Sequence, residues 1–188
     1  MQKEELSEEI KTIQSEIKSL EETRFFCPSF IQDSFDFLTK KLPNANAHLL
    51  YEYVELLDDE WREAVEGYIG NNRFSVIVSS EYEKEAIDIV RQNNLKIKII
   101  QGKKVLDELS YRGKSIDEES IVNLLKITNE KAEAYLITAY GDVLQVQNSQ
   151  ELTKAKRGVT VDCKAASGNL LFTCDLKDKR FIFGEEAQ

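Results

Sequence analysis

Hydrophobic residues recur at a heptad spacing along residues 1–22. Leu6, Ile10, Ile13, Ile17 and Leu20 alternate spacings of four and three, which are the a and d positions of a coiled coil. The pattern predicts a coiled-coil helix over residues 1–23, and its apolar seam needs a partner helix. No other segment of the sequence has a comparable period, so the partner is another molecule or a segment outside this sequence. An amphipathic helix lying on the domain is the alternative.

The segment 61–78 combines a helix, a glycine stop and a strand. Its apolar residues fall at spacings of three and four and form one helix face: Trp61, Ala64, Val65, Tyr68 and Ile69. Gly70 is expected to end this helix, because glycine adopts the left-handed cap at little cost. The nearly continuous apolar run at 74–78 predicts a strand that is covered on both faces. We interpret the whole segment as core, since none of its side chains is chemically reactive.

Helices and strands alternate on both sides of this segment. A second helix is predicted to end near Pro43, and Ser80 with Glu83 form a capping box that begins another. A capping box at Ser115 predicts a helix that carries Leu125. Residues 101–116 are predicted as a connection with about one helical turn. The other predicted helices cover 129–140 and 150–155, and the predicted strands cover 48–56, 96–100, 143–147, 159–163, 170–176 and 181–183. This order indicates an α/β (mixed α+β) fold that includes parallel strand pairing.

The two halves of the sequence repeat one arrangement loosely. Tyr68 and Gly70 precede a strand and a capped helix, and Tyr140 and Gly141 do the same in the second half. The echo predicts two similar subdomains, although two generic α/β units could share these caps and stops by chance. The predicted organisation is a coiled-coil stub at 1–23, a first subdomain at 24–113 and a second at 114–188.

Composition describes a charged protein without a membrane segment. The 188 residues carry a formal net charge of -9, so binding to nucleic acid would require a local basic patch. The sequence contains neither a membrane-spanning apolar run nor a signal peptide, which predicts a cytoplasmic protein. Cys27, Cys163 and Cys174 are expected to be reduced thiols, although Cys163 and Cys174 could face each other on neighbouring strands.

The motifs of common catalytic and cofactor sites are absent from the sequence. It contains no Walker A loop, no G-x-G-x-x-G, no C-x-x-C and only one histidine, His48. We therefore predict no catalytic residues, no cofactor and no metal. A small-ligand regulatory domain that binds an anion at the turn 67–72 is the alternative. That turn leads from a helix into a strand, whereas an anion site needs a turn that leads into a helix N-terminus.

Basic residues cluster mainly toward the C-terminus. A solvated face is the ordinary explanation of such clusters, but together they could form one phosphate-binding patch. The candidate DNA-binding residues are Arg24, Lys154, Lys156, Arg157, Lys164, Lys177, Lys179 and Arg180.

The order of these motifs resembles the hinge domain of SMC-type (structural maintenance of chromosomes) ATPases. The resemblance covers residues 48–184. It is carried by the A-x-E helix core Ala64–Val65–Glu66 with the stop at Gly70, by the following strand and helix, and by the segment 158–162, which is similar to a V-T-L-D-G motif. Cys163 stands where that family usually has glycine, and the family's paired interface glycines are not evident. The resemblance implies two similar subdomains and an antiparallel coiled coil that enters and leaves the hinge.

The resemblance also implies a function. It indicates a non-catalytic hinge that joins two ATPase arms as a homodimer, in DNA organisation, repair or defence against foreign DNA. In the family, sheet edges of one protomer pair with edges of the other. The residues expected at the dimer interface are Lys96, Ile97, Lys98, Ile99, Gly141, Val143, Leu144 and Gln145.

Overall fold

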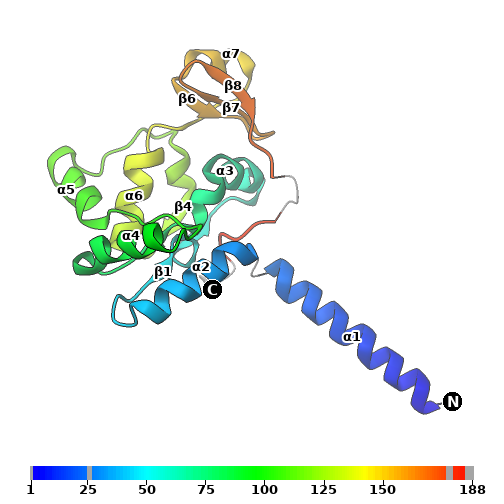
Figure 1. Ribbon diagram of the computed structural model, residues 1–188. Coiled ribbons are helices and arrows are strands. Elements are labelled where there is room, and N and C mark those ends of the chain that lie inside the picture. Colours follow the sequence, from blue (N-terminus) through cyan, green and yellow to red (C-terminus); the bar gives the residue numbers. More distant parts are fainter. Residues whose placement is uncertain (1, 25–26, 177–179, 185–188) are drawn as a thin grey trace.

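The computed structural model describes residues 2–24, 27–176 and 180–184, and in the first of these ranges it describes the side chains of residues 4–15. Helix α1 (Gln2–Arg24) extends away from the rest of the chain, as Figure 1 shows in blue. This confirms the predicted N-terminal helix. Leu6, Ile10 and Ile13 are each more than half exposed, so this stripe is not packed on the domain.

The rest of the described chain alternates short helices with very short strands (Figure 1). The α-helices are α2 (Ser29–Lys41), α3 (Arg62–Ile69), α4 (Glu83–Gln92), α5 (Gly102–Arg112), α6 (Glu130–Tyr140) and α7 (Ser149–Lys154). Single 3-10 turns are η1 (Leu50–Tyr53), η2 (Asp59–Trp61), η3 (Gly70–Phe74), η4 (Ser80–Tyr82) and η5 (Ile121–Leu124). The strands are β1 (His48–Leu49), β2 (Val54–Leu56), β3 (Val76–Ile77), β4 (Leu125–Ile127), β5 (Leu144–Gln145), β6 (Arg157–Val159), β7 (Lys164–Ser167) and β8 (Leu170–Thr173).

The strands form three small sheets. β1 pairs with β3, and β2 pairs with β4, both antiparallel. The third sheet has the order β5-β6-β7-β8, in which β5 and β6 are parallel and the other pairs are antiparallel. Ile99 adds a parallel bridge to Val76 of β3. The mixture of parallel and antiparallel pairing agrees with the predicted mixed fold.

Several sequence predictions are wrong in detail. The strand predicted at 48–56 is interrupted by η1, and residues 101–116 contain the full helix α5. The helix predicted from Ser115 does not form: Ser120 caps the short turn η5, and Leu125 begins a strand. The capping box at Ser80 is also absent, because a Glu83 carboxylate oxygen accepts the Lys103 backbone N–H across to α5 instead. Residues 181–183 do not form a strand, since Phe183 begins a turn, and β7 was not predicted.

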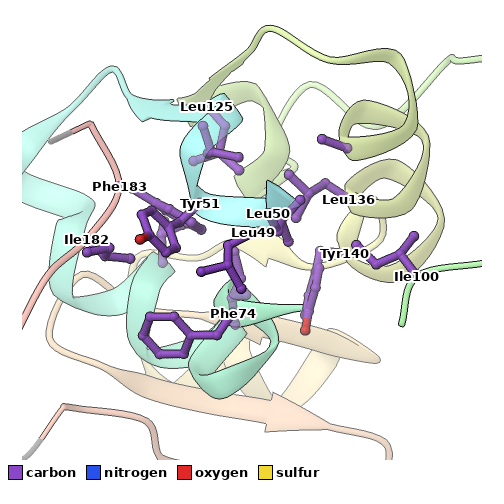
Figure 2. Packing of buried hydrophobic residues seen from close by; sticks show 14 of the residues in the cluster. Leu49, Leu50, Tyr51, Phe74, Ile100, Leu125, Leu136, Tyr140, Ile182 and Phe183 are labelled. Carbon is purple, nitrogen blue, oxygen red and sulfur yellow. The ribbon is translucent and has the colours of Figure 1, made fainter. Parts of the chain in front are cut away.

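One hydrophobic cluster joins the sheets and helices. It reaches from Ile31 in α2 to Phe183 near the C-terminus, and a smaller cluster lies between α7 and the third sheet. Figure 2 shows Ile182 and Phe183 in the same cluster as Leu50 and Tyr51. β2 and β4 pair across the predicted boundary between residues 113 and 114. The two-subdomain division stays a prediction, and the core is shared across it.

Membrane insertion has no candidate segment in the part of the chain described. Its helices are either too short or too polar to cross a lipid bilayer.

Candidate dimer interface

The predicted interface segment at 96–100, here called the edge segment, forms an open sheet edge. The Val76 N–H donates to the Lys98 carbonyl, and the Ile100 N–H donates to the Val76 carbonyl, both at 2.8 Å. In a parallel bridge of this kind, the residue that lies between the two hydrogen-bonded residues directs its own N–H and C=O away from the sheet. Those groups belong to Ile99, and they have no hydrogen-bond partner among the described residues. The edge segment can therefore accept another strand.

Two hollows flank the edge segment. One, of about 510 Å³, is lined by Ile87 of α4 together with Ile99 and Gln101. The other, of about 390 Å³, lies toward α5 and α6 and is lined by residues that include Lys98 and Tyr135. Successive side chains of a strand point to opposite faces. Because Ile99 and Gln101 line both hollows, a strand added to the edge segment would place side chains next to them.

The second predicted interface segment, around β5, is not an open edge. β6 pairs with β5 on one side. On the other side Ser120 forms an antiparallel bridge to Leu144, and the Gln145 N–H donates to the Glu119 carbonyl at 2.7 Å. Val143 is fully buried, and its carbonyl accepts the Ile121 N–H. An added strand has no free ladder groups to bind here.

Gly141 serves internal packing. A Cβ atom at this position would lie 2.4 Å from the Ile137 carbonyl oxygen and 2.9 Å from the Ile116 Cγ2 atom. The absence of a side chain therefore brings the end of α6 close to the loop before η5. The predicted role of Gly141, a close approach to a partner chain, is not needed to explain a glycine here.

β8 is the open edge of the third sheet. The Cys174 N–H donates to the Cys163 carbonyl, which continues the β7–β8 register and makes Cys163/Cys174 a hydrogen-bonded pair. Because such pairs alternate with non-hydrogen-bonded pairs, the N–H and C=O groups of Leu171 and Thr173 point outward. Figure 1 shows β8 at the rim of its sheet, away from the body of the chain. Sequence analysis placed a strand here but did not identify it as the free edge.

β8 is also unusually apolar for an exposed strand. Leu170, Leu171 and Phe172 are 70%, 61% and 42% exposed. A long apolar edge without charges is a site where another strand adds, and soluble proteins normally protect such edges. Phe172 keeps one internal contact, with the ring of Tyr68 at 6.1 Å between centroids. The strand is thus positioned by α3 but leaves most of its apolar surface uncovered.

Close backbone packing fixes the end of β8 against α3. A Cβ atom at Gly67 would lie 1.8 Å from the Cys174 carbonyl oxygen, so only glycine allows this approach. The Cys174 thiol lies 3.7 Å from the Ala64 carbonyl oxygen. Burial raises the pKa of Cys174 to about 12 and also raises the pKa of Cys163. Thiolates are the reactive form of cysteine, so the raised pKa values disfavour reaction of either thiol at neutral pH. Both cysteines are free, as predicted, and they face each other across β7 and β8.

A buried carboxylate ties the C-terminal segment 180–184 to α3. Glu66 is fully buried, and its Oε1 atom accepts hydrogen bonds from Arg73 Nη1 at 2.8 Å and from the backbone N–H of Ile182 at 2.7 Å and Phe183 at 3.2 Å. Its Oε2 atom accepts from Arg62 Nη1 at 3.2 Å. The same Arg62 atom donates to the Phe183 carbonyl at 2.6 Å. Sequence analysis treated Glu66 only as part of a motif, although the arginines four residues before and seven after it were a usable signal.

Arg157, a predicted DNA-binding residue, is largely occupied within the fold. Its Nη1 atom donates to the Ala139 carbonyl and to the Asp142 carboxylate, both at 2.6 Å. Its guanidinium also lies 5.7 Å from the ring centroids of Tyr68 and Tyr140. Burial raises the pKa of Tyr140, so its hydroxyl stays protonated and accepts a hydrogen bond from Asn72. Arg157 therefore joins the third sheet to α6 and α3.

The remaining candidate DNA-binding residues divide into two groups. Lys154, Lys156 and Lys164 are exposed around the third sheet, and Arg180 is exposed next to the C-terminal segment. The side chain of Arg24 and residues 177–179, with Lys177 and Lys179, lie outside what the structure describes. With Arg157 in β6, the structure thus gathers four of the eight candidates around one small sheet, and three of the four are exposed.

No metal site is found within the described ranges. His, Cys, Asp and Glu side chains do not gather there in groups of three or more that could hold an ion. The histidine His48 instead contacts Glu52 through Nδ1 at 2.8 Å and Asn46 through Nε2 at 3.1 Å.

Comparisons with known proteins give one consistent answer. The sequence matches no family model and no curated protein. The fold is similar to the SMC hinge domain of Pyrococcus furiosus, with a TM-score of 0.58 and 18% identity over 76% of this chain and 81% of that one. It is also similar to that hinge with an extended coiled coil, with a TM-score of 0.63 and 18% identity over 93% of this chain and 68% of the other.

A third similar structure is an asymmetric dimer of the Geobacillus stearothermophilus SMC hinge domain. The TM-score is 0.60 and the identity 14%, over 91% of this chain and 75% of that one. These agreements bear out the resemblance that the sequence motifs indicated. The chain has the fold of an SMC hinge domain.

Proposed function

We propose that the chain is a non-catalytic, cytoplasmic dimerisation domain that joins two coiled-coil arms. The observation that supports this most directly is the pair of open sheet edges on one chain, the edge segment and β8. Each has outward backbone groups without partners among the described residues, and β8 adds exposed apolar side chains. Unpaired strand edges bind other strands through main-chain hydrogen bonds.

The two edges can be used together in a closed dimer. The edge segment of one copy would pair with β8 of the second, and a two-fold axis would repeat the contact. Two equal contacts then satisfy the edge segment and β8 of both chains and close the dimer. Alternate β8 side chains, with Leu170 and Phe172 on one face and Leu171 on the other, would enter the two hollows beside the edge segment. This proposal keeps the predicted residues 96–99 at the interface and uses β8 in place of β5.

The arm helix supplies the second part of the proposal. Leu6, Ile10 and Ile13 form an exposed apolar stripe at heptad spacing on α1. Such a stripe is stabilised when a partner helix covers it. We assign it to an antiparallel coiled coil within a larger SMC-like ATPase, in a system for DNA organisation, repair or defence against foreign DNA. The dimer would hold two such arms together.

Exchanging one exposed leucine tests the dimer. Leu171→Lys places a charge in the proposed contact beside Lys98, and we expect the dimer to weaken by about 30-fold or more, since a buried unpaired charge costs about 2 kcal/mol or more. Leu57 is a matched control, because it is 62% exposed against 61% for Leu171 but belongs to neither the edge segment nor β8. Light scattering across a concentration series measures the mass, which for the unsubstituted chain should approach twice 21.6 kDa.

Comparing the two substitutions distinguishes a contact at the β8 edge from non-specific hydrophobic association. Leu57→Lys should leave the association constant unchanged. Equal weakening by both substitutions would show that exposed leucines act non-specifically, and a chain that stays monomeric at millimolar concentration contradicts the proposed function. Ile99→Pro offers a second check, because it removes an outward N–H that makes no internal hydrogen bond. It should also produce monomers.

DNA contact is a second candidate role, favoured by three exposed lysines around the third sheet. Lys154, Lys156 and Lys164 form no ion pair with any described residue, so their charges are available to phosphates. We expect the triple exchange to glutamate to reduce binding to duplex DNA and to lower the slope of log affinity against log salt by about one per lost contact. Fluorescence anisotropy measures both quantities. A control that reverses the exposed residues Lys40, Lys84 and Lys103 should change the slope less, and equal effects argue against a localised patch.

A further inference from the structure

Two lysines give the edge segment a charge that β8 lacks. Lys96 and Lys98 are both exposed, and they alternate with Ile97 and Ile99. Lys98 Nζ donates to the Asn72 side-chain oxygen at 2.7 Å, a neutral partner that leaves its charge in place. Neither lysine pairs with a carboxylate in the described part of the chain. The outward backbone groups of the edge segment are therefore flanked by positive charges.

The carboxylates nearest to the two hollows do not neutralise these lysines. Glu83 accepts the backbone N–H of Lys103 at 3.1 Å. Glu108 forms an ion pair with Arg112 at 3.7 Å, one turn along α5. Lys104, which lines the hollow toward α6, adds a further positive charge. Lys96, Lys98 and Lys104 thus place three positive charges along this edge, although the whole chain carries a net charge of -9.

We infer that Lys96 and Lys98 decide which edges pair: they prevent the edge segments of two copies from pairing with each other and leave β8 of the second copy as the partner. This inference rests on the proposed dimerisation and adds the specificity of its contact. Like charges placed directly opposite each other destabilise a strand pair, and charged residues on edge strands block unwanted pairing.

The register of a self-pairing shows how strong this effect is. In one antiparallel register, Ile97 of one copy forms backbone hydrogen bonds with Ile99 of the other. This register places the Lys98 residues of the two copies directly opposite each other. This is a non-hydrogen-bonded position, where Cα atoms lie about 4.5 Å apart and side chains are closest. When Ile97 instead faces Ile97, Lys98 lies opposite Lys96. Two registers therefore set lysine against lysine.

The third register offers too little pairing to compensate. It sets Ile99 opposite Ile99, and its next outward pair would need residue 101. Gln101 is the N-terminal cap of α5, and its carbonyl accepts the Val105 N–H at 3.0 Å. The chain therefore turns into a helix where the ladder would have to continue. Only one hydrogen-bonded pair remains in this register.

β8 imposes no such penalty on the edge segment. Its four residues, Leu170 to Thr173, are uncharged. In an antiparallel pairing that bonds Ile99 to Leu171, Lys98 lies opposite Phe172, an aromatic ring that a cation contacts favourably. In a parallel pairing with β8, the lysines of the edge segment likewise lie opposite uncharged residues only. The same lysines thus disfavour one partner and accept the other.

A charge-complementation experiment tests the inference. Both chains carry Leu171→Pro, which removes an outward N–H of β8 and adds no charge. One chain keeps Lys96 and Lys98, and the other carries Lys96→Glu and Lys98→Glu. Each alone is expected to be monomeric, because like charges still meet. Their equimolar mixture is expected to form a heterodimer at least about tenfold more tightly than either chain self-associates, since lysine then faces glutamate.

Each outcome of this experiment is informative. A mixture that stays monomeric at concentrations where the unsubstituted chain is dimeric overturns the inference, and so does dimerisation of either Leu171→Pro chain alone. High salt should dissociate the heterodimer, because charges are screened within about 3 Å at 1 M. Persistence of the heterodimer in 1 M salt also contradicts a charge-determined specificity. A monomeric unsubstituted chain instead contradicts the proposed function itself, so the two failures are distinguishable. Circular dichroism confirms that each variant is folded.

Discussion

Replacing Glu66 with glutamine is expected to lower the free energy of unfolding by about 3–5 kcal/mol, because breaking one partner of a buried ion pair leaves the other charge without compensation. The side chain of Arg73 is 4% exposed and would lose its only carboxylate partner in the described chain. Glutamine also presents an amide NH₂ to a site where every neighbour is a donor: Arg62, Arg73 and the amides of Ile182 and Phe183.

The measurement is denaturation by urea at one fixed protein concentration, since self-association contributes to apparent stability. The urea concentration at the midpoint of unfolding should fall, while the slope of the unfolding free energy against urea concentration stays constant. Hydrogen exchange supplies a second readout, because the Ile182 and Phe183 amides lose their acceptor and should exchange faster than core amides. Glu63→Gln is the control, since Glu63 lies on the same helix and forms no ion pair with a described residue. Equal destabilisation by both exchanges would contradict the role assigned to the buried carboxylate.

Replacing Gly67 with alanine is expected to destabilise the fold by about 2–3 kcal/mol, although alanine is about 1 kcal/mol better than glycine within a helix. The new Cβ atom would lie 1.8 Å from the Cys174 carbonyl oxygen, a backbone atom that cannot rotate away. β8 would therefore have to move from α3. The same displacement would shift Phe172 from Tyr68, so we also expect weaker dimerisation.

Gly102→Ala is the matched control for this prediction. Its Cβ atom would lie 2.5 Å from Cδ of Lys131, but that atom belongs to a flexible side chain. The added atom would also lie 3.1 Å from the Glu83 Oε1 atom, which is likewise the end of a flexible side chain. Rearrangement would weaken the hydrogen bonds from Lys131 Nζ to the Val78 carbonyl and from the Lys103 N–H to Glu83, so we expect a change within about 1.5 kcal/mol. Thermal unfolding of the two variants side by side measures the difference. Equal melting temperatures would mean that β8 adjusts freely and is not fixed by α3.

Local patterns predicted the helices best. The periodic apolar residues around Val65 predicted α3, and the helix predicted at 129–140 agrees with α6. The heptad stripe on α1 was also predicted, because helical periodicity is a property of a single segment. α5 was missed because its residues are mostly polar, and its helix is stabilised where Val105 and Leu109 pack on the core.

Strand details and buried charges depended on distant residues. The run 48–56 predicts one strand, but the structure divides it between two partners, with β1 bound to β3 and β2 bound to β4. In the local sequence Glu66 is an ordinary helix glutamate. In the structure its carboxylate accepts hydrogen bonds from the amides of Ile182 and Phe183, which lie more than 110 residues away. Strand pairing and burial are set by contacts that the local sequence does not contain.

The amino-acid sequence by itself determined the arm helix, helices such as α3 and α6, the mixed α/β class and the resemblance to an SMC hinge. That resemblance also implied a candidate interface at residues 96–99, because sheet edges pair between protomers in the family. Only the tertiary structure decided which other edge is free. β5 is closed by Ser120, which precedes it by more than twenty residues, whereas nothing in the described chain covers β8. An edge is open or closed according to its neighbours in space, and that is why the folded chain was needed to identify β8.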